Sequence, residues 1–137
     1  MPLRGVFTCK FFRWRTILHL NMEDINPIIF YTATILEWKH LLKNDKYKNI
    51  VIESLQFCVA DIRVLIFGFV IMPNHIHLLW SMRDGMKQES VQRNFMKFTA
   101  QQMKFDLQKT NTEYLSHFKS GAVDRQYQFW ERNPRSF

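Results

Sequence analysis

The feature that most constrains the fold is a nearly continuous apolar run, followed at once by a turn and a second apolar run. Residues 63–71 read RVLIFGFVI, a length and composition typical of a buried strand. The next three residues, 72–74, contain a proline and an asparagine, which favour turn geometry. Residues 75–80 (HIHLLW) are therefore expected to return as the antiparallel partner. The sequence predicts a β-hairpin at the centre of a sheet.

One more strand and two amphipathic helices are expected around this hairpin. Residues 28–36 (IIFYTATIL) are rich in β-branched and aromatic side chains, which predicts a strand. Asn44 can cap a helix that ends near Asp61, because apolar residues follow it at i, i+3 and i+4 spacing. A second helix is expected over residues 90–110, and no structure is assigned beyond it. This order predicts an α+β domain with a ferredoxin-like or RRM-like antiparallel sheet and helices packed on one face.

Two histidines begin the second strand of the hairpin. Because side chains alternate across a strand, His75 and His77 should point to one face, roughly 6.6 to 6.8 Å apart, while Ile76 points to the other. Both imidazoles can reach one ion and leave positions open for another ligand and for phosphate oxygens, as in an octahedral Mg²⁺ or Mn²⁺ site. Two histidines alone do not exclude zinc. Such a pair is more often simply polar surface, so the pattern by itself does not establish a metal site.

The string GFVIMPNHIHLLW, residues 68–80, resembles the signature of the HUH transposases, which include the insertion-sequence and REP-associated tyrosine transposases. Residues 91–105 (VQRNFMKFTAQQMKF) are similar to the helix after the histidine strand in the REP-associated branch. The resemblance covers most of the chain. It implies a single-strand DNA transposase in which His75 and His77 bind a divalent metal, Mg²⁺ or Mn²⁺, and in which hairpin-forming single-stranded DNA is the partner. Members commonly act as dimers, so a homodimer is expected.

The resemblance also implies a tyrosine nucleophile, whose hydroxyl attacks the scissile phosphate to leave a 5′-phosphotyrosine and a free 3′-OH. The family places it on a C-terminal helix in a Tyr-Ile-x-x-Asn-Pro-like stretch, and no such stretch occurs here. Tyr127 is the candidate, with Tyr114 second, although Tyr127 is expected rather to pack or to stack on DNA. We expect a C-terminally truncated copy that lacks the true nucleophile and a third metal ligand. Nicking by this polypeptide alone is therefore not expected.

The charge of the chain favours an anionic partner. Lys and Arg outnumber Asp and Glu by 19 to 12, which gives a formal charge of +7. Basic side chains on the second helix and near it are expected to bind phosphates, and a tryptophan in the tail is expected to stack on bases. These expected DNA-binding residues are Arg83, Arg93, Lys97, Lys104, Arg125 and Trp130.

Other features of the sequence limit the class of protein. Residues 1–21 form a basic, apolar leader without a signal-peptide cleavage site, expected to be an over-extended start or a basic arm before a transposase-like domain over 22–137. Cys9 and Cys58 have no CxxC partner, so neither a disulfide framework nor a thiolate metal site is expected, as suits a cytoplasmic protein. The apolar run 64–72 is too short to span a membrane.

Two alternative functions remain open. An RRM-like sheet can bind single-stranded nucleic acid through aromatic residues without any chemistry, although the run LIFGFVIM only faintly resembles an RNP motif. A metal-dependent hydrolase would combine His75 and His77 with an acidic ligand, of which Asp84 is the closest in sequence. The first alternative gives the histidines no role, and the second lacks a known hydrolase motif.

Overall fold

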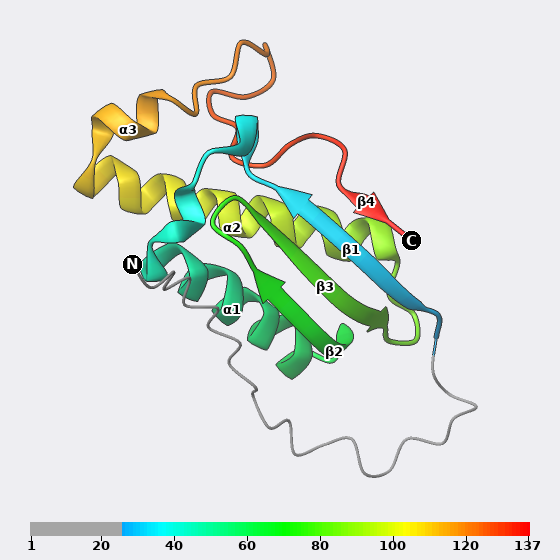
Figure 1. Cartoon of the computed structure of the whole chain (residues 1–137). Coiled ribbons are helices and arrows are strands. Elements are labelled where there is room, and N and C mark those ends of the chain that lie inside the picture. Colours follow the sequence, from blue (N-terminus) through cyan, green and yellow to red (C-terminus); the bar gives the residue numbers. More distant parts are fainter. Residues whose placement is uncertain (1–25) are drawn as a thin grey trace.

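The computed structural model describes residues 26–137, which form a four-stranded sheet covered by helices (Figure 1). The expected leader, residues 1–21, lies outside the described residues. Helices and strands alternate in the order β, α, β, β, α, β if the short helical turns are left aside. The elements are β1 (Ile28–Thr34), η2 (Leu36–Trp38), η3 (Leu41–Lys43), α1 (Asp45–Ala60), β2 (Val64–Ile71), β3 (His75–Met82), α2 (Gln88–Thr110), α3 (Thr112–Ser116) and β4 (Arg135–Ser136).

The sheet is antiparallel throughout and has the strand order β2-β3-β1-β4. The predicted hairpin is formed by β2 and β3, with one irregularity of register between Ile66 and Gly68. On its other side, β3 pairs with β1 along its length, from Ile28 opposite Ser81 to Thr34 opposite His75. This order and element sequence are those of a ferredoxin-like α+β domain, so the predicted fold class is confirmed.

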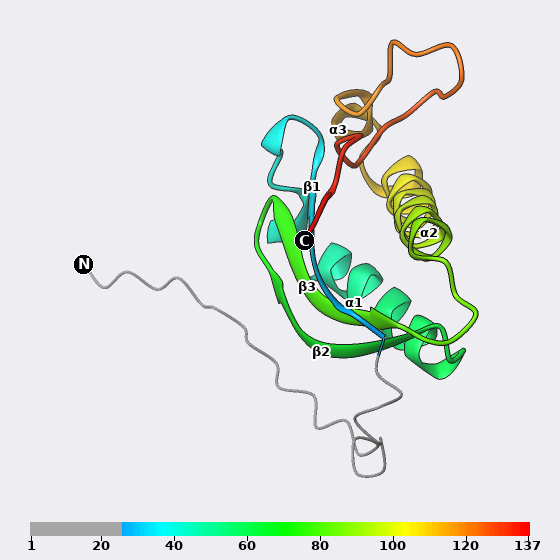
Figure 2. The ribbon, with the colours of Figure 1, turned by 90° about the vertical axis from the view of Figure 1, so that its right-hand side faces the viewer.

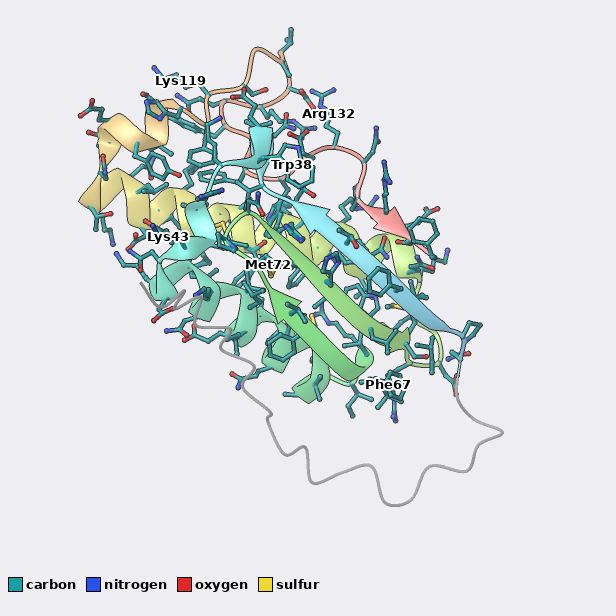
Figure 3. All side chains as sticks on the ribbon, viewed as in Figure 1. Trp38, Lys43, Phe67, Met72, Lys119 and Arg132 are labelled. Carbon is teal, nitrogen blue, oxygen red and sulfur yellow. The ribbon has the colours of Figure 1, made fainter. Side chains whose placement is uncertain are left out.

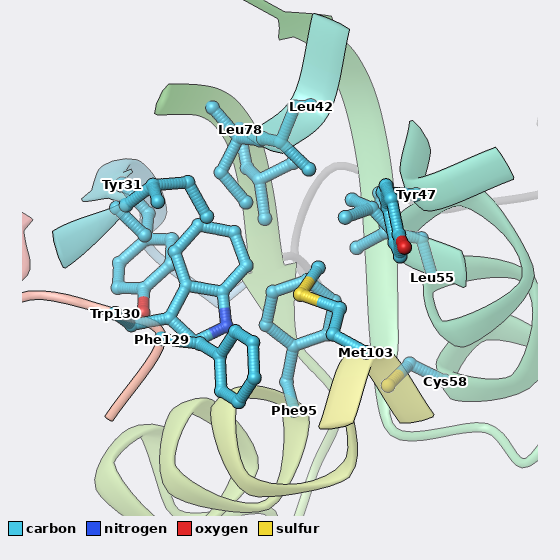
Figure 4. Packing of buried hydrophobic residues seen from close by; sticks show 14 of the residues in the cluster. Tyr31, Leu42, Tyr47, Leu55, Cys58, Leu78, Phe95, Met103, Phe129 and Trp130 are labelled. Atoms are coloured by element: carbon cyan, nitrogen blue, oxygen red, sulfur yellow. The ribbon is translucent and has the colours of Figure 1, made fainter. Parts of the chain in front are cut away.

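Both long helices pack on the same face of the sheet, which Figure 2 shows from the side. The core side of β3 consists of alternate residues, among them Ile76, Leu78 and Trp80, all fully buried. From α2, Phe95 and Met103 pack into this core (Figure 4). Within residues 26–137, neither long helix lies on the opposite face of the sheet, called the open face from here on (Figure 2).

The first helix begins where the sequence predicts it. The side chain of Asn44 accepts a hydrogen bond from the backbone N–H of Lys46 at 3.0 Å, which satisfies one of the free donors of the first turn. Burial of Tyr47, Val51 and Leu55 then fixes the helix against the sheet. The apolar spacing therefore predicted both the limits of this helix and its buried side.

The tail after α2 is ordered by long-range contacts that the sequence did not indicate. The segment returns along β1, where Ile35 pairs with Trp130. It ends as β4, which pairs with the edge of β1 that does not face β3. The indole Nε1 of Trp130 donates a hydrogen bond to Thr99 Oγ1 at 3.0 Å inside the core. The aromatic residues of the tail thus complete the core of the domain.

Among the helices of residues 26–137, none combines the length and the apolar character needed to cross a membrane.

Candidate nucleic-acid and metal site

His75 and His77 lie side by side on the open face. Their direct neighbours on β1 are Thr34 and Thr32, and side chains opposite one another in an antiparallel pair point to the same face. The two imidazole ring centres are 4.8 Å apart, with the ring planes at 78°. The residue between them, Ile76, is buried on the helix side. The alternation predicted for this strand is confirmed.

Each imidazole is held through its Nδ1 atom by a neighbouring polar side chain. His75 Nδ1 lies 2.7 Å from Asn74 Oδ1, and His77 Nδ1 lies 2.8 Å from Thr32 Oγ1. Because a carboxamide oxygen can only accept, Nδ1 of His75 carries the proton and its Nε2 presents a lone pair. The threonine hydroxyl can accept from Nδ1 of His77 in the same way. Such partners orient histidines and select their tautomer in metal sites.

The environment keeps His75 neutral over a wider range of pH. Its partial burial disfavours the charged form, and the neighbouring His77 opposes a second positive charge, so the pKa of His75 lies below its ordinary value. A neutral imidazole is the form that binds metal ions. The lowered pKa therefore keeps His75 in the form that a metal ion would need.

The spacing of the two rings agrees with that of two neighbouring ligands of one divalent ion. At a metal–nitrogen distance of about 2.1 Å, two imidazoles bound at a right angle have ring centres roughly 4.6 Å apart, close to the 4.8 Å between His75 and His77. Within residues 26–137, no three His, Cys, Asp or Glu side chains are grouped so that they could hold one ion. The remaining positions would therefore fall to water, phosphate oxygens or a ligand from elsewhere.

Asp84 does not belong to this site. It follows the far end of β3, where its carboxylate accepts a hydrogen bond from Asn26 Nδ2 at 2.9 Å. Between His77 and Met82 the strand alone rises roughly 17 Å at about 3.3 Å per residue. The geometry does not support the hydrolase alternative, which needed Asp84 as a metal ligand.

The open face contributes further residues that the sequence did not single out. Phe30 stacks on the ring of His77, with centres 5.3 Å apart and planes at 19°. Arg135 of β4 pairs with Thr32, so Thr32 lies between this arginine and His77 in one row across three strands. Phe137 exchanges backbone hydrogen bonds with Phe30, which adds a second exposed aromatic ring to the neighbouring row. Only the register between β1, β3 and β4 brings these residues together.

The four tyrosines of the chain are engaged in packing. Tyr31 faces the core, and burial raises the pKa of its hydroxyl. The Tyr47 hydroxyl donates to Asp106 at 2.8 Å, and desolvation, with this hydrogen bond, raises the pKa of Tyr47 to about 12. Burial also raises the pKa of Tyr114, which packs among other aromatic rings. Tyr127, the candidate nucleophile, lies between α3 and β4, partly buried against the core.

The expected basic surface of α2 lies away from the histidines. Val91 and Phe95 of α2 are buried against the sheet, so Arg93 and Lys97, two residues further along a helix, point to the outside of the molecule. That side is opposite to the open face. The structure therefore does not bring these two residues together with the histidine pair.

The other expected DNA-binding residues are dispersed. Lys104 Nζ lies 5.3 Å from the ring centre of its neighbour Phe105. Arg125 pairs with Asp124 at 3.0 Å on the loop before β4, and Arg83 follows β3 at the end remote from His75. Together with Arg93 and Lys97, they do not form one patch around the histidines.

Trp130 corrects an expectation. It was expected to stack on DNA bases, but it is only 5% exposed and its indole N–H is bonded to Thr99 in the core. A ring packed in this way has no free face for a base. The expectation failed because an aromatic residue in an unassigned tail can serve the core or a partner equally well.

Comparisons with known proteins identify the fold. No protein-family model matches the sequence, and no curated protein is similar to it at a significant level. Among solved structures, a REP-associated tyrosine transposase bound to a REP hairpin aligns with a TM-score of 0.56 and 15% identity, over 82% of this chain. The chain spans 56% of that transposase's length.

A second solved structure, a candidate transposase from Deinococcus radiodurans R1, aligns with a TM-score of 0.56 and 11% identity. The match covers 88% of this chain and 85% of that one. The fold implied by the histidine motif is thus confirmed. Over most of its length, the chain has the fold of these two transposases.

Proposed function

We propose that this protein binds hairpin-forming single-stranded DNA across the open face of its sheet, with a divalent ion held by His75 and His77. The observation that carries the proposal is the pair of imidazoles, each oriented through Nδ1 by Asn74 or Thr32. The HUH-like motif and the hairpin bound by the structurally similar transposase support the choice of DNA. A formal charge of +7 agrees with this partner.

The residues of the site would act mainly by positioning. A divalent ion bound there would polarise an oxygen of the DNA phosphate as a Lewis acid. Asn74 and Thr32 would hold the ligand rings in place, and Phe30 would support the ring of His77 from one side. Arg135, beyond Thr32 in the same row, would neutralise a neighbouring phosphate.

We propose further that this polypeptide recognises DNA without cutting it. In the transposases that the histidine motif resembles, a tyrosine would nick the strand and carry it to a new site. The four tyrosines of this chain lie in the core or pack beside it. Their contacts give no support to an attack on a phosphate at the histidines. Recognition, by contrast, would depend on the residues of the open face.

A second candidate is a non-catalytic domain that binds single-stranded nucleic acid without a metal. The exposed rings of Phe30 and Phe137, which lie opposite one another on the open face of the sheet, favour this candidate. RRM-like sheets stack bases on such aromatic residues. The two candidates differ in their need for a divalent ion. EDTA should abolish tight binding in the first and leave it unchanged in the second.

The test is a cleavage and binding assay with Mn²⁺ on single-stranded DNA hairpins labelled at the 3′ end, the end that a 5′-phosphotyrosine adduct would retain. We expect the wild type to bind without forming a covalent protein–DNA adduct. An adduct that is lost in His75→Ala would show that the chain is a nuclease and would direct attention to Tyr127 and Tyr114. Failure to bind any single-stranded hairpin would refute the proposal as a whole.

The dimer implied by the resemblance is also a proposal. Strand β2 forms one edge of the four-stranded sheet, and Phe67 and Val70 of this strand are exposed. No strand of the described part of the chain pairs with the outer edge of β2, and such an edge can pair with another copy. Sedimentation velocity would detect the dimer, and a single monomeric species at high protein concentration would contradict it.

A further inference from the structure

The loop after β1 presents a tryptophan to solvent in a strained conformation. Trp38 is 61% exposed, an unusual state for so large an aromatic side chain. Its backbone φ is 57°, and that of the preceding Glu37 is 54°. Non-glycine residues seldom adopt this left-handed region, and two in succession are rarer still. The surrounding structure must therefore stabilise this loop.

Several contacts hold the loop in place. Leu36 N donates to Phe129 O at 2.8 Å, and Glu37 N donates to the carboxylate of Glu131 at 2.7 Å. The ammonium group of Lys39 closes the loop through an ion pair of 2.8 Å with Glu37. The segment before β4 thus supplies both an acceptor carbonyl and an acceptor carboxylate to a loop far from it in sequence. None of these contacts uses the indole ring.

The loop places the indole beside the histidine pair. The ring centres of Trp38 and His75 are 6.1 Å apart, with the planes at 68°. A further hydrogen bond, from Ile35 N to Asn74 O at 2.8 Å, ties the loop to the residue that orients His75. In Figure 3, Trp38 lies near the end of β1.

We propose that Trp38 stacks on the base of the nucleotide next to the phosphate held at His75 and His77. This inference rests on the proposed function. Indole rings stack on any base, because every base has a π-face, so this contact would bind the strand without reading its sequence. The strain at Glu37 and Trp38 fits such a role, since strained backbone is retained where a side chain must be held in position for a ligand.

The rest of the chain argues against a purely structural role for this ring. Trp80 and Trp130 are buried, as expected of tryptophans that stabilise a core. Phe57 is similarly exposed, at 55%, but it lies on α1, on the helix side of the domain. Trp38 is thus a large exposed ring edge-to-face with His75, one of the candidate metal ligands, and Phe57 provides a matched control.

The test measures binding of the full chain to a single-stranded DNA hairpin with an unpaired extension, by fluorescence anisotropy in Mn²⁺. Trp38→Ala should weaken binding by about 5-fold to about 100-fold, the range for loss of one stacked base. Phe57→Ala should bind like the wild type. Trp38→Gly should bind DNA as weakly as Trp38→Ala. Because glycine relieves the backbone strain at this φ, Trp38→Gly should not destabilise the loop, so equal weakening would be due to loss of stacking and not to loss of folding.

A second readout locates the base. Abasic nucleotides are placed one at a time along the extension. One abasic position should weaken the wild type to the level of Trp38→Ala and should not weaken Trp38→Ala further. DNA should also quench the tryptophan fluorescence of the wild type more strongly than that of Trp38→Ala.

The outcomes separate the two proposals. If the wild type binds hairpins and both Trp38 variants bind them as tightly as the wild type does, the stacking proposal is overturned and the proposed function stands. If abasic positions weaken the wild type and Trp38→Ala by the same factors, stacking by this residue is likewise overturned. If the wild type binds no single-stranded DNA, both proposals fail.

Discussion

Replacement of Thr32 by valine tests whether the open face is built to hold a metal ion. Thr32 Oγ1 lies 2.8 Å from Nδ1 of His77 and is the partner that orients this ring. Valine has nearly the same shape but cannot form this hydrogen bond. Loss of such an outer partner typically lowers metal affinity by about 10-fold to 100-fold, or roughly 1.4 to 2.7 kcal/mol.

The matched control is Thr34→Val. Thr34 lies on the same strand and the same face, directly opposite His75, but His75 is oriented by Asn74 instead. Mn²⁺ binding by isothermal titration calorimetry should therefore weaken in Thr32→Val and stay near the wild-type value in Thr34→Val. Thermal unfolding without metal would show that both variants are folded.

Two results would refute this reasoning. Equal Mn²⁺ affinity in Thr32→Val and the wild type would mean that the hydroxyl does not orient a ligand. Equal loss in both valine variants would mean that the strand, and not the hydrogen bond to His77, is responsible.

Three further predictions follow from the geometry. The folded-state pKa of His75 lies below its ordinary value of 6.5, so the contribution of His75 to stability should be complete above pH 6.5 and should fall as the pH is lowered. His75→Gln should remove this contribution from the pH dependence of urea unfolding. Trp130→Phe should lower the free energy of unfolding by about 1 to 3 kcal/mol, because the indole hydrogen bond to Thr99 is lost in the core; a change within error would contradict its structural role. Arg135→Ala should reduce the slope of log affinity for single-stranded DNA against log salt by about 0.7. Lys97→Ala, on the opposite side of the domain, should leave this slope unchanged. The reverse pattern would mean that DNA binds to the helical face.

Local patterns were sufficient to predict the hairpin and the first helix. The apolar run of β2, the turn at residues 72–74 and the cap at Asn44 are signals carried by neighbouring residues. The same holds for the two histidines, whose common face follows from the alternation of a strand. Features that depend only on residues close together in the sequence could therefore be predicted.

The tail and the surroundings of the histidines depend on pairing between distant segments. Trp130 and Arg135 have positions only because the tail returns along β1, and no periodicity in the tail indicates this. Thr32 became a partner of His77 through the register of β1 with β3. These contacts span many residues of sequence, which is why the open face could not be assembled from motifs.

The direction in which the basic side chains of α2 point could, in contrast, have been predicted from the sequence. The buried stripe that includes Val91 and Phe95 predicts that Arg93 and Lys97 point away from the sheet. The histidines face away from the helices because Ile76 faces toward them. Combining these two alternations would have placed the basic helical face and the histidine pair on opposite sides of the domain.

The most direct test of the central claim is the effect of Mn²⁺ on affinity for a single-stranded DNA hairpin, measured by anisotropy in the wild type and in a His75→Ala, His77→Ala double variant. His117→Ala, which removes an exposed histidine at the end of α3, is the control. We predict that Mn²⁺ strengthens binding by the wild type and by the control but not by the double variant. Equal stimulation of all three proteins, or none in any, would contradict a metal-dependent DNA site on the open face.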